Sequence, residues 1–409
     1  MEKAVELILV NISGTDRPGV TSALTEILAK YEALILDIGQ ADIHHTLSLG
    51  ILFKTDSSKS GDILKELLFK ASELNVAIRF SPVSVENYET WVGLQGKNRY
   101  VITVLGRRIT ARQIASVTQV IVEQGLNIDG IQRLTGRMPL ADTVENISKS
   151  KGCIEFSVRG TPKNYALMQS QFMELANELE FDISLQQDTL YRRCRRLICF
   201  DMDSTLIETE VIDELADRAG VGAEVRDITA RAMRGEIDFK ESFRERVALL
   251  KGLDESVMRD IAEHLPITEG VERLMTVLKR AGYKIAILSG GFTYFGNYLK
   301  NKFGIDYVYA NELEIVDGKL TGNYVGEIVD GQRKAELLRL LAQVERVDIA
   351  QTIAVGDGAN DLPMLTVAGL GIAFHAKPKV KESARQSIST IGLDGVLYFL
   401  GFKDSFIES

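Results

Sequence analysis

The chain has 409 residues, a length that predicts two or three domains. Hydrophobic residues make up 45% of it and charged residues 26%, which argues against a disordered or fibrous protein. The 57 acidic residues outnumber the 48 basic ones and give a formal charge of −9, so we expect neither nucleic acid nor an anionic membrane as a main partner.

The N-terminal stretch and the cysteines indicate the cellular compartment in which we expect the protein. Residues 1–20 contain no basic segment leading into an apolar one, and no apolar run approaches the roughly 20 residues of a membrane span. Cys153, Cys194 and Cys199 form no CxxC pair and lie near no histidine cluster, which argues against a disulfide framework or a structural zinc site. We therefore expect a cytoplasmic protein.

One pattern of strands and helices occurs twice in the first half of the chain. In the first copy the predicted order is strand, helix, strand, strand, helix, strand, over Val5–Gly14, Pro18–Tyr31, Leu34–His45, Leu47–Thr55, Ile63–Leu74 and Val76–Val85. The second copy repeats this order over Arg99–Arg107, Ile109–Gln124, Leu126–Leu134, Cys153–Val158, Tyr165–Leu179 and Phe181–Gln187. Tandem βαββαβ units are typical of ferredoxin-like α+β domains, which we expect over residues 1–86 and 98–190, with the polar stretch Asn87–Lys97 as a linker.

The turn after the first strand, Gly14–Val20, carries a distinctive sequence. Proline near a helix start suits its fixed φ, and Gly19 lets a ligand approach free N–H groups. The segment resembles the signature of ACT domains, ferredoxin-like modules that bind amino acids, and this implies a regulatory site for serine or another amino acid at Asp16, Gly19 and Val20. A tight turn without a ligand is the alternative. The second copy, Leu105–Thr110, lacks the Asp-x-Pro-Gly core, which favours a scaffold or pairing role there. Pairing of such modules also predicts a homodimer or a larger homo-oligomer.

The pattern changes after Arg192–Arg196. Short apolar runs without alternation are separated by helical patterns, which predicts a Rossmann-like parallel sheet covered on both faces, over residues 191–409. The predicted strands are Leu197–Phe200, Lys284–Leu288, Tyr307–Tyr309 and Thr352–Val355, and the helices are Val271–Ala281, Phe295–Phe303 and Lys334–Val344. The long, mostly helical stretch of about residues 206–266 predicts an inserted cap.

Two aspartates follow the first of these strands directly. Asp201 and Asp203 are two residues apart, so in an extended chain both side chains point to the same side. Neighbouring carboxylates repel unless a cation lies between them or one takes up a proton. A divalent ion with oxygen ligands meets this need, and Mg²⁺ suits carboxylate, carbonyl and water ligands.

Three further sites follow along the chain. Ser289–Gly291 ends the second strand and offers a hydroxyl and backbone N–H groups to a phosphate oxygen. Lys334 begins a helix and supplies positive charge to a phosphoryl group. After a later strand, Asp357 and Asp361 add the carboxylates that complete a metal site.

In this order the four sites resemble the motifs of the haloacid dehalogenase-like phosphatases. The cap segments Arg231–Gly235 and Phe239–Val247 narrow the resemblance to the phosphoserine phosphatases of that superfamily, and it extends from Leu197 to the C-terminus. The resemblance implies hydrolysis of O-phospho-L-serine, the last step of serine biosynthesis.

The resemblance also implies a role for each site residue. Asp201 would be the nucleophile that forms an aspartyl-phosphate, and Asp203 would act as general acid and then general base. Mg²⁺ would be held by the carboxylates of Asp201 and Asp357 and by the backbone carbonyl of Asp203. The residues implied to bind the phosphate are Ser289, Gly290, Lys334 and Asn360. In the cap, Glu210 would receive the substrate ammonium and Arg246 its carboxylate, while Met233 and Phe239 would close the pocket.

Other interpretations remain open on the sequence alone. Lys334, Glu210 and Arg246 could each be a solvated surface charge. A phosphotransferase that passes the phosphoryl group to another alcohol, such as homoserine, would use the same catalytic residues. A non-catalytic sensor is disfavoured, because it should have lost at least one of Asp201, Asp203, Lys334 and Asp357.

Overall fold

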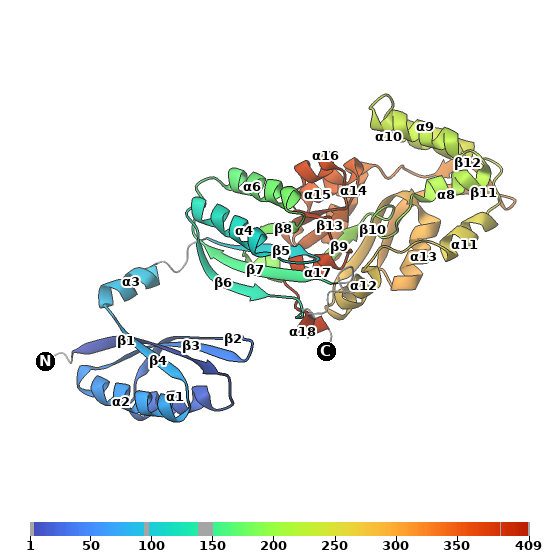
Figure 1. The fold of residues 1–409 in the computed structure, drawn as a ribbon. Helices are drawn as coiled ribbons and strands as arrows, with labels where there is room; N and C mark the ends of the chain where they lie inside the picture. The colour runs from blue at the N-terminus through green and yellow to red at the C-terminus, as the bar shows by residue number, and fades with distance from the viewer. Residues whose placement is uncertain (1–3, 94–97, 138–149, 385, 408–409) are drawn as a thin grey trace. The chain divides into compact units, whose positions relative to one another are not determined.

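The computed structural model describes residues 4–93, 98–137, 150–384 and 386–407 (Figure 1). It divides into two compact units, Met1–Lys97 and Asn98–Ser409. The first unit contains the first βαββαβ copy, and the second unit contains both the second copy and the α/β domain. Among the described residues, none of the helices combines the length and the apolar character that crossing a membrane requires.

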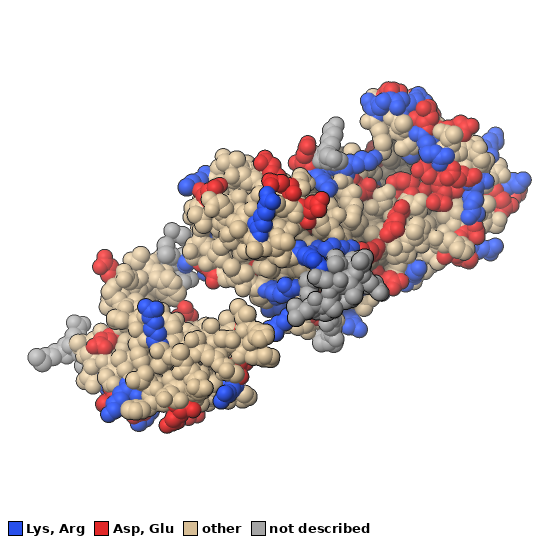
Figure 2. Space-filling model, in the orientation of Figure 1, with Lys and Arg blue, Asp and Glu red and all other residues tan. Residues whose placement is uncertain are grey.

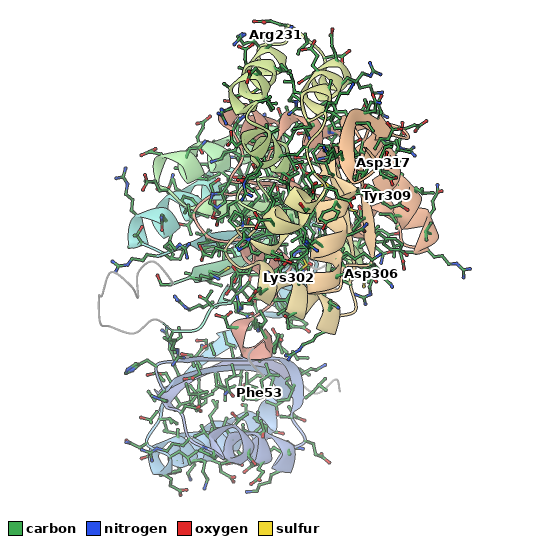
Figure 3. All side chains as sticks on the ribbon, turned by 90° about the vertical axis from the view of Figure 1, so that its right-hand side faces the viewer. Phe53, Arg231, Lys302, Asp306, Tyr309 and Asp317 are labelled. Carbon is green, nitrogen blue, oxygen red and sulfur yellow. The ribbon has the colours of Figure 1, made fainter. Side chains whose placement is uncertain are left out.

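The first module is a four-stranded sheet in the order β2-β3-β1-β4 with two helices on one face. Its elements are β1 (Val5–Thr15), α1 (Val20–Lys30), β2 (Leu34–Ile43), β3 (Thr46–Asp56), α2 (Ser57–Glu73) and β4 (Ala77–Val83). Phe53 lies between the sheet and the helices and is fully buried (Figure 3). The apolar residues that face the helices alternate along β1 and β3, as side chains on one face of a strand do.

The segment after β4 differs from the prediction. Where a polar linker was expected, residues Val85–Gly93 form helix α3, and none of its residues is buried. Tyr88 and Trp91, three residues apart, have ring centroids 6.0 Å apart on one side of this helix. The last four residues of the predicted linker, 94–97, lie outside the described residues.

The second module repeats the topology with the order β6-β7-β5-β8. Its elements are β5 (Arg99–Gly106), α4 (Ala111–Glu123), β6 (Asn127–Arg133), β7 (Gly152–Arg159), α6 (Tyr165–Glu178) and β8 (Asp182–Gln187). Helix α4 begins with a capping box in which Thr110 and Gln113 satisfy each other's backbone N–H groups. The predicted ferredoxin-like fold is therefore confirmed for both copies.

The α/β domain is built on a seven-stranded sheet in the order β12-β11-β10-β9-β13-β14-β15. Its strands are β9 (Leu197–Phe200), β10 (Lys284–Phe292), β11 (Tyr307–Val316), β12 (Lys319–Val325), β13 (Thr352–Gly356), β14 (Leu370–Phe374) and β15 (Gln386–Ile388). All neighbouring pairs are parallel except β11 with β12. Ile198 and Phe200 belong to the core on one face and Leu197 and Cys199 to the core on the other, which is why these strands read as continuous apolar runs.

The hairpin of β11 and β12 was not predicted. Asp317 and Gly318 form its turn, and both have positive φ, 52° and 75°. An Asp-Gly pair between two apolar strands is a strong hairpin signal, so the sequence did contain the information. Asp317 lies at the outer end of this ribbon (Figure 3).

Helices cover both faces of the sheet, and four more form the predicted cap. The helices beside the sheet include α12 (Val271–Arg280), α13 (Thr293–Phe303), α14 (Gly331–Val344), α15 (Leu362–Val367) and α17 (Gly395–Phe399). The cap comprises α8 (Val211–Ala219), α9 (Gly222–Met233), α10 (Phe239–Leu249) and α11 (Ser256–Glu263), and Arg231 marks its far end (Figure 3). An isolated bridge between Ile207 and Ile267 joins the two chain segments that enter and leave the cap.

The second module is attached to the α/β domain along the edges of their two sheets. Strand β8 lies beside β15, and the side chain of Gln386 makes two hydrogen bonds to the backbone of Leu185 across this seam. The carboxylate of Asp182, 1% exposed, accepts hydrogen bonds from the backbone N–H groups of Ser389 and Thr390, at 2.6 and 3.0 Å.

A shared core strengthens this attachment. Leu105, Leu134 and Cys153 of the second module belong to the same buried apolar cluster as the α/β domain. Lys151 forms an ion pair with Asp394, whose side chain is fully buried. The second module and the α/β domain are thus one structural unit.

Candidate active site

The predicted site residues gather at the carboxyl ends of the parallel strands. Asp201 follows β9, and its N–H donates to the carbonyl of Val355 in β13 at 2.9 Å. Ser289 lies in β10, and Asp357 follows β13 directly. Because β10 and β13 flank β9, the three residues reach the same edge of the sheet.

Lys334 is fully buried between two carboxylates. Its Nζ lies 2.9 Å from Oδ1 of Asp201 and 2.7 Å from Oδ1 of Asp361. It is positioned by the first turn of α14, where Asp330 caps the helix by accepting from the N–H of Arg333. Burial lowers the pKa of Lys334, but the two carboxylates outweigh this and hold the pKa above its ordinary value. The structure therefore excludes a solvated surface lysine at this position.

Three carboxylates form a group that could hold a metal ion. Ligand oxygens of Asp201, Asp357 and Asp361 all lie within 4.8 Å of one another. Burial, followed by the charges of Asp201 and Glu210, raises the pKa of Asp357 to about 7. Lys334 supplies one positive charge against three negative ones, so a further cation is needed for all three to ionise. An all-oxygen donor set of this kind fits Mg²⁺.

Asp203 has an environment that suits a proton donor. Its side chain is 8% exposed, and its Oδ1 accepts from the N–H of Val211 at 3.1 Å. Burial and the charges of Glu210 and Asp201 raise the pKa of Asp203 well above its ordinary value. A side chain on Gly291 would collide with Oδ2 of Asp203, so the glycine lets the strand end approach this carboxyl closely.

The predicted phosphate-binding residues lie around these carboxylates. Ser289 is fully buried, and its hydroxyl accepts from the N–H of Gly291 at 3.0 Å. Asn360 lies in the short 3₁₀ turn η2 (Ala359–Asp361) that follows Asp357. Gly290 has no side chain, and a Cβ there would lie 3.0 Å from the ring of Phe239 in the cap.

The sequence analysis did not identify Asn311, which holds the backbone of Gly290 near the end of β10. Its amide donates to the carbonyl of Gly290 at 2.8 Å and accepts from the N–H of Val329 at 2.8 Å. Asn311 is 1% exposed and lies in β11. A polar residue in a buried strand was the one signal that could have identified it.

The cap brings two charged residues toward the site from different helices. Glu210 is the N-cap residue of α8 and accepts from the hydroxyl of Ser204 at 2.8 Å. Arg246 on α10 is half-buried and donates to the carbonyl of Ser242 at 3.3 Å and the hydroxyl of Thr229 at 3.5 Å. Burial raises the pKa of Glu210 and lowers the pKa of Arg246, and the charge of each residue opposes this change in the other, although the two side chains form no ion pair within the described residues.

The two predicted closing residues occupy different positions. Phe239 stacks on Phe243, with ring centroids 6.5 Å apart, and lies against Gly290. Met233 at the end of α9 is 67% exposed, and its sulfur accepts from Nζ of Lys377 at 3.6 Å. The structure therefore brings Phe239 into the site and leaves Met233 on the rim, where the cap meets the α/β domain.

The predicted regulatory loop of the first module has the backbone expected of an open turn. Gly19 has a φ of +95° and is the N-cap residue of α1, and among the described residues other than its chain neighbours no atom lies within 4 Å of the position its Cβ would take. Asp16 is exposed, and its N–H donates to the carbonyl of His45 at 2.9 Å. Val20 is buried in the apolar core of the module, so it anchors the end of the loop to that core.

Three family models match the chain. Two describe an ACT domain, over residues 6–81 and 99–186, and the third describes a haloacid dehalogenase-like hydrolase over residues 198–366. These ranges coincide with the two βαββαβ modules and with the α/β domain that carries the site. Both resemblances seen in the sequence are confirmed.

Two relatives are similar along nearly the whole chain. A phosphoserine phosphatase of Streptomyces coelicolor is 39% identical over 406 residues, which cover 99% of this chain and 94% of the relative. Phosphoserine phosphatase SerB2 of Mycobacterium tuberculosis is also 39% identical, over 98% of this chain and 95% of the relative. A crystal structure of a probable phosphoserine phosphatase from Vibrio cholerae is 38% identical, with a TM-score of 0.58, and covers 74% of this chain and 86% of that one. Because the similarity extends through both modules and through the domain that holds Asp201 and Lys334, this chain belongs to the phosphoserine phosphatase family.

Proposed function

We propose that this chain hydrolyses O-phospho-L-serine to L-serine and phosphate through an aspartyl-phosphate, as the last step of serine biosynthesis. The observation that carries the proposal is that the two carboxyl groups at the end of β9, those of Asp201 and Asp203, have different surroundings. Asp201 forms an ion pair with Lys334 at 2.9 Å, while burial raises the pKa of Asp203 well above its ordinary value. A nucleophile and a proton donor two residues apart are what phosphoester hydrolysis in two steps requires.

The contacts of Asp201 indicate which of its oxygens attacks. Oδ1 accepts from the N–H of Met202 at 2.8 Å and from Lys334, which leaves Oδ2 to form the new bond to phosphorus. The bond from phosphorus to the seryl oxygen then breaks, and Asp203 gives its proton to that oxygen. In the second step Asp203 takes a proton from water as the water attacks the aspartyl-phosphate, which releases phosphate and restores both carboxyl groups.

The remaining site residues hold the phosphoryl group. Lys334 balances the negative charge that accumulates on the phosphoryl oxygens, and Ser289, Gly290 and Asn360 supply hydrogen-bond donors around it. The carboxylates of Asp201 and Asp357 and the backbone carbonyl of Asp203 would hold Mg²⁺, which when bound neutralises carboxylate and phosphate oxygens. The three-carboxylate group described above supports this assignment.

Specificity for the amino-acid end is assigned to the cap. Glu210 would receive the ammonium group and Arg246 the carboxylate, with Phe239 and Met233 excluding water when the cap closes. The support is that the charges of Glu210 and Arg246 act on each other, although the two side chains form no ion pair within the described part of the chain.

Regulation and assembly are assigned to the ACT modules. We place serine or another amino acid at the loop Asp16–Val20, where the free N–H groups of α1 suit a carboxylate and Asp16 suits an ammonium group. We expect a homodimer or larger homo-oligomer, formed through these modules. The cysteines of the chain are free thiols, which fits the reducing cytoplasm.

The test compares phosphate release by the full chain and by Asp201→Asn. The substitution removes the anionic nucleophile at nearly constant shape, so turnover of O-phospho-L-serine should fall by about 10³-fold or more while the protein stays folded. Chelation should abolish activity and Mg²⁺ restore it, whereas Ca²⁺ should support little. Near wild-type hydrolysis by Asp201→Asn would contradict the proposal. Transfer of phosphate to an added alcohol instead of water would favour a phosphotransferase.

A further inference from the structure

Helix α8 presents two acidic residues, one turn apart, to the cationic residue of α10. Glu210 caps α8, Asp213 lies three residues later in its first turn, and α8 and α10 pack against each other. Burial lowers the pKa of Arg246, and the charges of Glu210, Asp213 and Asp203 oppose this in that order. The guanidinium of Arg246 therefore lies in the field of both acidic residues of α8.

One carboxylate oxygen of Asp213, Oδ1, is buried without a hydrogen-bond donor among the described residues. The next residue, Glu214, lies in the same turn and does have a partner, the hydroxyl of Thr209 at 2.8 Å. A buried acceptor without a donor is destabilising, so a specific use is a better account of Asp213 than fold stability.

Arg246 is the cation that interacts with this carboxylate. Burial raises the pKa of Asp213, and Arg246 is the largest of the charges that oppose this. Within the described part of the chain Arg246 makes no ion pair, and its two hydrogen bonds, to Ser242 and Thr229, are long, at 3.3 and 3.5 Å. No short hydrogen bond or ion pair with a described residue therefore fixes the guanidinium of Arg246.

We propose that Asp213 is a positioning residue, which draws Arg246 away from Glu210 and so leaves both residues free for the two charges at the amino-acid end of the substrate. This rests on the proposed function. Without the charge at Asp213, the attraction on Arg246 would come mainly from Glu210, and a half-buried ion pair between them would have to break before the substrate could bind. Asp213 thus determines specificity without touching the phosphoryl group.

The experiment measures kcat and KM of Asp213→Asn for two substrates. For O-phospho-L-serine we expect kcat/KM to fall about tenfold, mostly through a higher KM, because one charge that positions Arg246 is lost. For an aryl phosphate such as 4-nitrophenyl phosphate, which lacks the amino-acid end, kcat/KM should stay within about twofold. Turnover of the aryl phosphate also shows that the variant is folded.

The matched control is Glu214→Gln. It removes a carboxylate charge from the same helical turn, so it has the same effect on the helix dipole, but Glu214 is bonded to Thr209. It should leave the ratio of the two kcat/KM values unchanged. Equal changes of this ratio in both variants, or an unchanged ratio in Asp213→Asn, would overturn the positioning role.

Two further variants locate the effect. Asp213→Glu keeps the charge and should keep the preference for O-phospho-L-serine, even if Asp213→Asn fails to fold. In an Arg246→Ala background, Asp213→Asn should cause no additional loss, because its action passes through Arg246. An additional tenfold loss there would overturn the inference. If the wild-type chain itself shows no preference for O-phospho-L-serine over the aryl phosphate, the proposed function fails instead.

Discussion

The two ACT modules share one topology and differ in what surrounds them. The first forms a unit of its own, and its edge strand β2 exposes apolar residues, including Leu34, Ile38 and Ile43. The second lies in the same unit as the α/β domain, and its edge strand β8 is placed against β15. The apolar cores of the two modules are equivalent, so the fold depends on the core and the role depends on the edges.

One pair of equivalent positions shows how small the sequence difference is. Ala77 begins β4 and pairs with Ser13, and Asp182 begins β8 and pairs with Leu105, each at the end of the ladder near the loop. Ala77 is exposed, whereas Asp182 is buried and receives three hydrogen bonds from Ser389 and Thr390. The carboxylate of Asp182 is thus one of several contacts that attach the second module, and an alanine at the equivalent position of the first module cannot make it.

The largest expected effect is that of removing the second module. A chain that starts near Arg192 would uncover the apolar residues that pack against Leu105 and Cys153 and would leave buried Asp394 without Lys151. We expect a loss of at least about 5 kcal/mol in unfolding free energy, enough to prevent stable folding. A chain that starts at Asn98 lacks only the first module and should keep its thermal transition and its phosphatase activity. Equal stability of the two chains would mean that the modules do not differ in this way.

Asp182→Ala tests the attachment at one residue. It leaves the partly buried N–H groups of Ser389 and Thr390 without their acceptor, so the free energy of unfolding should fall by about 2 kcal/mol. Chemical denaturation measures this loss. The matched change Ala77→Asp, at the exposed equivalent position in the first module, should cost less than about 0.5 kcal/mol. Similar costs at both positions would contradict the comparison.

Gly19→Val tests whether the first module is the one that senses amino acids. At a φ of +95° a β-branched residue is strained by about 1–3 kcal/mol, and the loop should lose its shape while the rest of the module stays folded. The change in kcat/KM that added serine causes, expected to be about 5-fold or more, should disappear, and basal turnover should remain. Gly125→Val, at another positive φ of +74° in the second module, is the control and should leave the response intact. Loss of the response in both variants would remove the special role of the first loop.

Arg107→Ala should have the smallest effect. Arg107 holds Glu269 through two hydrogen bonds, at 3.0 and 2.6 Å, but half of the Glu269 side chain is exposed, so we expect a loss of about 0.5–1 kcal/mol. The hydrogen bond from Arg107 lowers the pKa of Glu269. This stabilisation is present above the ordinary pKa of a glutamate and is lost as pH falls through the lowered value. Unfolding measured between about pH 7 and pH 3 should therefore show a weaker pH dependence in the variant than in the wild type.

Most of the fold could be predicted from the sequence because hydrophobic period and chain order carry that information. The β-rich run Val5–Gly14 predicted a strand, and the continuous apolar run Leu197–Phe200 predicted a strand that is buried on both faces. Asp201, Ser289 and Asp357 could be placed together because each directly follows or ends a parallel strand. Their metal and catalytic roles stay predictions that the experiments above address.

What could not be predicted depends on contacts between distant residues. The burial of Lys334 follows from Asp361, 27 residues away, and the role of Asn311 follows from its contact with Gly290. The exposure of Met233 depends on the position of the cap, which no local pattern specifies. On the visible face several acidic side chains adjoin one another near the end of the α/β domain that carries the cap (Figure 2), a grouping that composition alone does not show.

The seam between β8 and β15 also has a consequence for synthesis on the ribosome. Leu185 precedes Gln386 by 201 residues, so β8 leaves the ribosome long before the three-residue strand that it will meet. A domain made first can fold first, so the folded second module can offer the backbone of Leu185 to Gln386 when the last strand of the α/β sheet is made. An exposed sheet edge can pair with other chains and cause aggregation. Here the edge strand β15 is covered by β8 of the same chain. During synthesis the second module would thus be folded and ready to cover the last strand of the α/β sheet as soon as that strand is made.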